Sequence, residues 1–192
     1  GLSSQTRAKI SYPPEEFISF YTRALDYIIA LNLKNKLFHE RFALIFLTKI
    51  LTVRDPNYLD IRSPCGAGIG QLAYNFNGDI YTCDEARMLG RRQDESFKLG
   101  NIKQGTYQEI INGPVVKTMC IASCLDNLAG CSHCLYKPYC GVCPVYNHAV
   151  NGNIFVKNAF LCKINSAILD YLFDKLRDKT VKKIFRRWVG AQ

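Results

Sequence analysis

Four cysteines lie within thirteen residues of the sequence, from Cys131 to Cys143, in the spacing C-x2-C-x5-C-x2-C. The wider region from Cys120 to Cys143 has too few apolar residues to build a core of its own. Closely spaced thiolates are ligands for zinc and for iron-sulfur clusters. We therefore expect a bound metal to organise this region.

The chain has nine cysteines, an odd number that disulfide pairing cannot exhaust. Its 192 residues are 48% hydrophobic, so it can bury a core without disulfides. The first ten residues lack the apolar segment of a signal peptide, and no run approaches the roughly 18 apolar residues of a membrane span. We expect a cytoplasmic protein with reduced cysteines and no membrane partner.

The formal charge is +9, with every thiol counted as neutral. A site of four thiolates carries about −2, whether it holds one Zn²⁺ or an oxidised [4Fe-4S] core, because ligating thiols are deprotonated. Two such sites would lower the charge to about +5. The basic composition therefore gives little support to nucleic acid as a partner.

Two segments show helical periodicity. Apolar residues recur at steps of three and four from Ser11 to about Val53, which predicts a helical hairpin. The same pattern returns in residues 160–176 and predicts a C-terminal helix with Cys162 in its first turn. The basic tail that follows contains Ile184, Phe185 and Trp188, and we expect a frayed helix end with a docked aromatic rather than a binding surface.

Between these segments the pattern is mixed. Asn77 and Gly78 separate two short strand-like runs and favour a hairpin with a type I′ turn, in which both central residues have positive φ. Residues 97–102 predict a strand or turn, and residues 106–113 a short helix. The predicted fold class is α+β: a helical hairpin, then a small metal-organised domain with a β-hairpin and a C-terminal helix.

Two interpretations of the thiols differ in function. A zinc site would need only Cys131, Cys134, Cys140 and Cys143, and the protein would then be a zinc-stabilised module that binds protein or nucleic acid through its basic tail. That interpretation leaves five cysteines unexplained. An iron-sulfur cluster often takes a ligand from a distant part of the chain, so neighbouring cysteines can serve different clusters.

The order of the cysteines resembles the SPASM domain, the C-terminal auxiliary iron-sulfur region of radical SAM peptide maturases. The similar pattern is C65-x12-G78-x4-C83, then C131-x2-C134-x5-C140-x2-C143, then Cys162. The spacing from Cys140 to Cys143 is one residue shorter than the C-x3-C of the family. The stretches SPCGAGIGQLAYNFNGDIYTCDEARM and FKLGNI also resemble the maturases of His-Xaa-Ser peptide-modification systems.

The resemblance implies two auxiliary [4Fe-4S] clusters, and it assigns their ligands. One cluster would be held by Cys131, Cys134, Cys140 and Cys162. The other would be held by Cys65, Cys83 and Cys143, because the family's remaining ligand, between the first two cysteines, is missing here. Either Cys120 or Cys124 could replace it, with replacement slightly favoured, or one iron could stay open to substrate or solvent. Zinc could occupy the same thiols in protein prepared in air.

The resemblance also suggests a catalytic residue, Asp84, which follows Cys83. In sulfatase-maturing relatives an Asp at this place is proposed to take a proton from the substrate, a role that suits a carboxylate with a raised pKa in a dry pocket. A surface Asp that caps the next turn is the competing interpretation.

A radical SAM enzyme uses a C-x3-C-x2-C motif to bind S-adenosylmethionine, and this chain lacks one. We therefore expect residues 1–62 to be the end of a radical SAM partial barrel and residues 63–192 to be a SPASM-like domain. Only the full-length parent, a peptide-modifying oxidoreductase, would bind S-adenosylmethionine. The expected partners are a peptide substrate, the parent's N-terminal radical SAM domain and an electron donor or acceptor protein.

Overall fold

The computed structural model describes residues 11–190, which form two compact units. The cysteine unit is Leu59–Asn158, and the helical unit combines residues 11–58 with residues 159–190. The expected division at residue 62 is therefore close to the first boundary, but residues 159–190 group with the N-terminal helices instead of the cysteine-rich region. Each unit is described here by itself.

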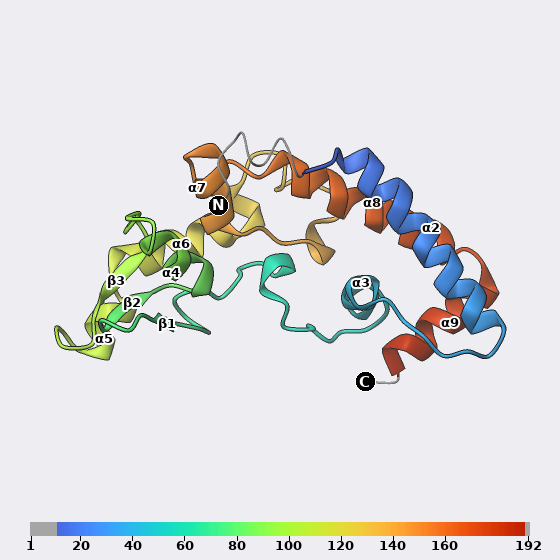
Figure 1. The fold of residues 1–192 in the computed structure, drawn as a ribbon, viewed down its shortest axis with the longest axis horizontal. Coiled ribbons are helices and arrows are strands. Elements are labelled where there is room, and N and C mark those ends of the chain that lie inside the picture. The colour runs from blue at the N-terminus through green and yellow to red at the C-terminus, as the bar shows by residue number, and fades with distance from the viewer. Residues whose placement is uncertain (1–10, 191–192) are drawn as a thin grey trace. The chain divides into compact units, whose positions relative to one another are not determined.

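The helical unit consists of α2 (Pro14–Leu33), α3 (Arg41–Leu51), α8 (Ala159–Lys175) and α9 (Lys179–Gly190). The predicted N-terminal and C-terminal helices are thus confirmed. The main partner of α2 is α8, and that of α3 is α9, so the N-terminal helices pack against the C-terminal ones more than against each other (Figure 1). The apolar face of the C-terminal segment is buried here, which explains why it joins this unit.

Local sequence explains where these helices begin. Pro14 opens α2 without wasting a backbone donor, and two glutamates follow in its first turn, at the positive end of the helix dipole. The carboxylate of Glu40 caps α3 by accepting from the backbone N–H groups of Phe42 and Ala43, at 2.9 and 2.7 Å. The hydroxyl of Tyr21, on α2, donates to the same carboxylate.

The tail is a docked helix that continues to Gly190, so the expectation of a frayed end is wrong and that of a docked aromatic is confirmed. Trp188 is 1% exposed, and its Nε1 donates to Oδ1 of the buried Asn32 at 3.2 Å. The Nδ2 of Asn32 donates in turn to the carbonyls of Ile28, at 2.9 Å, and Phe38, at 2.6 Å. One amide therefore joins α2, the connection to α3 and α9.

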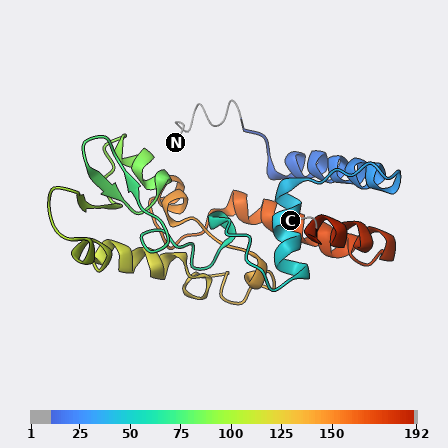
Figure 2. The ribbon, with the colours of Figure 1, turned by 90° about the horizontal axis from the view of Figure 1, so that it is seen from below.

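The cysteine unit contains a three-stranded antiparallel sheet in the order β1 (Ala73–Tyr74), β2 (Asp79–Tyr81) and β3 (Lys98–Asn101) (Figure 2). The predicted hairpin around Gly78 is confirmed, and so is a strand within residues 97–102. The predicted type I′ turn is wrong. Gly78 has φ +88°, but Asn77 is not among the residues with positive φ.

A three-residue connection explains this difference, since the backbone N–H of Asn75 donates to the carbonyl of Asp79 at 2.8 Å. The side chain of Asp79 then accepts from Asn77 Nδ2 at 2.8 Å and from Asn101 Nδ2 at 3.0 Å, and it pairs with Lys98 Nζ at 3.0 Å. These partners, the Asn101 amide first, lower the pKa of Asp79.

The remaining helices of this unit are short. They are α4 (Asp84–Gly90), α5 (Tyr107–Ile111), α6 (Pro114–Ser123) and α7 (Pro144–Asn151), with single 3-10 turns at Leu59–Ile61, Leu125–Asn127 and Lys137–Tyr139. The predicted short helix is α5, which begins with a reciprocal capping box between Thr106 and Glu109. None of the helices formed by residues 11–190 has the length and apolar character needed to cross a membrane.

We predict that Asn32→Ala lowers the free energy of unfolding of the helical unit by about 2 kcal/mol, because it leaves buried hydrogen-bonding groups unpaired. Trp188 is the single tryptophan of the chain, so its fluorescence reports this unit during urea unfolding. The matched control is Asn112→Ala, which removes an exposed amide that bonds only within α5 and its C-cap. An equal effect of the two substitutions would contradict the prediction.

The charge of Asp79 should stabilise the hairpin only above acidic pH. A carboxylate whose pKa is lowered by folding adds stability above its unfolded pKa, about 3.9, and loses it as the pH falls through the lower folded value. We predict that the β2 amides of the wild type exchange hydrogen more slowly than those of Asp79→Asn at pH 6, and that the difference disappears toward pH 2. A pH-independent difference would show that the charge is irrelevant.

Candidate metal centre

Three cysteines from distant parts of the sequence line one small cavity of about 10 Å³ in the cysteine unit. They are Cys65, Cys83 and Cys143, and Met119 lines the same cavity. Cys65 and Cys83 are buried and Cys143 is half-buried. The structure thus brings together the three cysteines that the resemblance assigned to one cluster.

Secondary structure positions each of these thiols. Cys83 follows β2 and is the N-cap of α4, whereas Cys143 is the N-cap of α7 and its Sγ accepts from the backbone N–H of Tyr146 at 3.4 Å. The loop after Cys65 is held against the end of β2 by the N–H of Gly68, which donates to the carbonyl of Thr82 at 2.8 Å. Sheet and helix ends therefore determine where the three sulfurs lie.

Burial makes these thiols poor acids. Desolvation raises the pKa of Cys83 to about 12 and that of Cys143 to about 12. Backbone hydrogen bonds at the helix starts lower both pKa values, but by less than burial raises them. Glu85 adds to both shifts through its negative charge. Thiolates at this site need a nearby cationic group to offset the cost of burying them, and a metal core supplies such a charge. The donor set therefore fits a metal cluster.

A second group of thiols lies in the loop before α7. Cys131 and Cys140 pack with Leu125, Leu128 and Val142, whereas Cys143 packs against the cluster of side chains that contains Cys65 and Cys83. Cys134 follows Cys131 in a turn, and the backbone N–H of Cys134 donates to the carbonyl of Cys131 at 3.0 Å. Cys140 and Cys143, three residues apart, thus pack with different clusters of side chains, which argues against one zinc site with four thiolates.

Within residues 11–190, no three His, Cys, Asp or Glu side chains are close enough together to hold a single metal ion. An iron-sulfur core is larger than one ion, because inorganic sulfides lie between its irons, and its ligating thiolates lie farther apart. All nine cysteines are free thiols.

The remaining predicted ligands lie on helices or at their ends. Cys162 is in the first turn of α8 and is half-buried, but it belongs to the helical unit, so its place in a cluster stays a prediction. Cys120 is on α6, and Cys124 is the residue that ends it. The Sγ of Cys124 is 3.9 Å from Oδ2 of Asp126.

Asp84 does not lie in a dry pocket. It is the first residue of α4, its side chain is 63% exposed, and it pairs with Arg87 at 2.6 Å. The geometry is that of a surface carboxylate near a helix start, and a catalytic role for Asp84 stays a prediction.

Sequence reasoning missed other residues that line the cysteine cavity, including Asp60, Gln71, Glu85 and Met119. Burial, and then the charge of Glu85, raise the pKa of Asp60. Glu85 could have been noticed because it is two residues from Cys83. The others belong to no motif, and only the fold brings them to the cavity.

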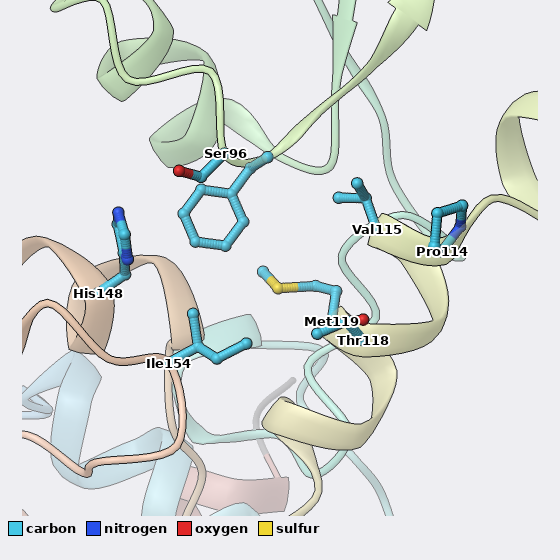
Figure 3. Close-up of a pocket in the computed structure, with 8 residues that line it drawn as sticks. Ser96, Pro114, Val115, Thr118, Met119, His148 and Ile154 are labelled. Carbon is cyan, nitrogen blue, oxygen red and sulfur yellow. The ribbon is translucent and has the colours of Figure 1, made fainter.

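A second cavity of about 260 Å³ was also missed (Figure 3). It is lined by Ser96, Phe97, Pro114, Val115, Thr118, Met119, His148 and Ile154. The Nε2 of His148 is 2.9 Å from Oδ2 of Asp94, and the Phe97 ring lies edge-on to the imidazole. Met119 lines this cavity as well as the one that holds the three cysteines.

Gly141 explains how the segment between Cys140 and Cys143 comes close to the start of the cysteine unit. A Cβ atom added at Gly141 would overlap the backbone of Ile61 and Arg62. Because backbone atoms cannot turn aside as a flexible side chain does, a larger residue would displace the whole segment.

We therefore predict that Gly141→Ala destabilises the cysteine unit by at least about 2 kcal/mol and reduces metal binding. The control is Gly70→Ala, whose added Cβ would meet only one carbonyl oxygen, at an ordinary 3.6 Å. Thermal unfolding followed by circular dichroism checks stability, and metal analysis checks binding. A Gly141→Ala protein as stable as the control would show that the close approach is not required.

Three comparisons with known proteins bear on this site. The SPASM family, described as an iron-sulfur cluster-binding domain, matches residues 65–144. No curated protein matches the sequence. Among solved structures, anSMEcpe with bound AdoMet has a similar fold, at a TM-score of 0.64 and 17% identity over 92% of this chain.

The same protein with bound AdoMet and the Cp18Cys peptide matches at a TM-score of 0.64 and 18% identity, over 91% of this chain. The chain spans only 45% of the length of either structure. These identities establish a shared fold alone. The family match and the geometry agree: Cys65, Cys83 and Cys143, which line one cavity, all lie within residues 65–144, the part of the chain that matches the SPASM iron-sulfur cluster-binding domain.

Proposed function

We propose that this chain is the auxiliary-cluster region of a radical SAM enzyme that modifies a ribosomally made peptide, and that it binds two [4Fe-4S] clusters. The observation that carries this proposal is the convergence of Cys65, Cys83 and Cys143 on one cavity, while Cys131 and Cys140 pack elsewhere. One motif thus contributes cysteines to two groups, as in iron-sulfur proteins with two clusters.

The first cluster would be held by Cys65, Cys83 and Cys143, and the second by Cys131, Cys134, Cys140 and Cys162. When bound, such clusters transfer single electrons at potentials set by hydrogen bonds to sulfur and by solvent exposure. The chain supplies a hydrogen bond to Cys143 from the Tyr146 N–H. Buried Tyr81, Leu89 and Phe97 pack around the first group and keep water away from it.

Several parts of the proposal come from the likeness to anSMEcpe, which was solved with AdoMet and a peptide. The rest of a full-length parent would bind S-adenosylmethionine, and the substrate would be a peptide, as in the His-Xaa-Ser systems that the sequence resembles. Residues 1–62 would end the partial barrel of the parent's radical SAM domain, and a separate protein would donate or accept electrons. A cytoplasmic location is part of the proposal, and the odd number of cysteines supports it.

Asp84 would meet the substrate only in the assembled parent. The exposed carboxylate is accessible, but it pairs with Arg87. Substrate binding would therefore have to displace the arginine before the carboxylate could take a proton.

We predict that the 192-residue chain, purified without oxygen, is brown and contains about eight irons and eight sulfides, with broad absorption near roughly 400 nm. Cys83→Ser and Cys131→Ser should each lose about half of the iron, because they remove ligands of different clusters. Ser132→Ala, next to Cys131, should keep all of it. A colourless protein with stoichiometric zinc and no sulfide would instead support a zinc-stabilised binding module.

A further inference from the structure

The first group of thiols supplies three cysteines, whereas a [4Fe-4S] core is commonly held by four thiolates. The candidates for the fourth position are the carboxylates of Asp60 and Glu85, which line the same cavity, and the thiols of Cys120 and Cys124, which lie on or at the end of α6, the helix that carries Met119 of that cavity. The packing of α6 distinguishes among them. The inference that follows rests on the proposed function.

Cys120 belongs to the inward face of α6. Val116, Met119 and Ser123 of this helix are buried. Cys120 lies four residues after Val116 and three before Ser123, and residues three or four apart lie on the same side of a helix. Met119, its immediate neighbour, lines the cavity with the three cysteines.

The loop that carries Cys65 contacts α6 and the turn that follows it. The N–H of Leu125, just after the helix, donates to Oγ of Ser63 at 3.0 Å. Near the start of the helix, a Cβ added at Gly68 would lie 3.2 Å from Cγ2 of Val116. Cys65 lies between Ser63 and Gly68 in the loop. Cys120 lies between the residues they contact, Val116 and Leu125.

We propose that Cys120 is the fourth protein ligand of the first cluster. It replaces the cysteine that the SPASM pattern places between Cys65 and Cys83, and it supplies that ligand from α6. The cluster would then join β2, α6 and the start of α7.

Cys124 is a matched control on the same segment. It leaves the helix with an extended backbone, at φ −83° and ψ 118°, and its Sγ is directed to Asp126. The next residue, Leu125, packs with Cys131. Cys120 and Cys124 are both half-buried, so exposure does not distinguish them, whereas their positions do: Cys120 lies within α6 and Cys124 ends it.

Alkylation tests the assignment without any substitution. The anaerobic 192-residue wild type, loaded with iron and sulfide, is treated with iodoacetamide, and the modified cysteines are identified by mass spectrometry. Cys120 should be protected until a chelator removes the iron, whereas Cys124 should react in both states. Equal labelling of Cys120 with and without the clusters would overturn the proposal.

Substitution tests it independently. Cys120→Ser should convert one cluster to a three-iron form, with its own EPR signal in the oxidised state, or lose it, so that iron falls from about eight to between about seven and four per chain. Cys124→Ser and Glu85→Gln should keep all the iron. Cys120→Asp, which offers an oxygen ligand, should retain more iron than Cys120→Ser. Circular dichroism of the metal-free proteins checks that all variants fold alike.

The outcomes separate this inference from the proposed function. If the wild type holds two clusters and Cys120→Ser is unchanged in iron content and EPR spectrum, the assignment of Cys120 is wrong and the proposed function stands. Loss of iron in Cys124→Ser, Glu85→Gln or Asp60→Asn, with Cys120→Ser intact, would assign the position to that residue instead. A wild type without iron or sulfide would reject the proposed function itself.

Discussion

The cost of burying thiolates governs the cysteine unit. Cys83 and Cys143 are held where desolvation raises the pKa of each thiol to about 12, and Glu85 increases both values. A thiol in such a place remains protonated at neutral pH unless a cation lies beside it. The two thiols nevertheless lie at helix starts, where backbone N–H groups favour negative charge. The proposed clusters would supply the positive charge that thiolates at these positions need.

In the proposed clusters, the same interaction would explain why so little regular structure is enough. The strands of the cysteine unit are two to four residues long, and its helices are short. Metal ligation by residues from the sheet and two helices would connect these elements as a larger hydrophobic core does elsewhere. Gly141, packed against the backbone of Ile61 and Arg62, shows how closely the ligand-bearing loop must approach the start of the unit.

Sequence reasoning succeeded where the signal is periodic or depends on spacing. Helical periodicity located the N-terminal helices and the one that carries Cys162, and Gly78 located the hairpin because a positive φ favours glycine. The order of the cysteines predicted the SPASM match of residues 65–144, and Cys65, Cys83 and Cys143 line one cavity, whereas their ligation of a cluster stays a prediction. The turn type was missed because Asn77 bonds through its side chain to Asp79, and the loop has three residues.

Tertiary packing decided the rest. The sequence of the C-terminal segment shows an apolar face but does not show that α2 and α3 cover it, so the division of the chain differed from expectation. The carboxylate of Asp60 and the thioether of Met119 reach the cysteine cavity from segments without any motif. The choice between Cys120 and Cys124 likewise depends on which side of α6 faces the loop of Cys65, and spacing alone does not determine it.

The most direct test of the account is anomalous diffraction at the iron edge from crystals of the 192-residue chain grown without oxygen. The account predicts two separate iron peaks, one among Cys65, Cys83 and Cys143 and one beside Cys131, Cys134 and Cys140. A single metal atom bound jointly by Cys131, Cys134, Cys140 and Cys143 would contradict it.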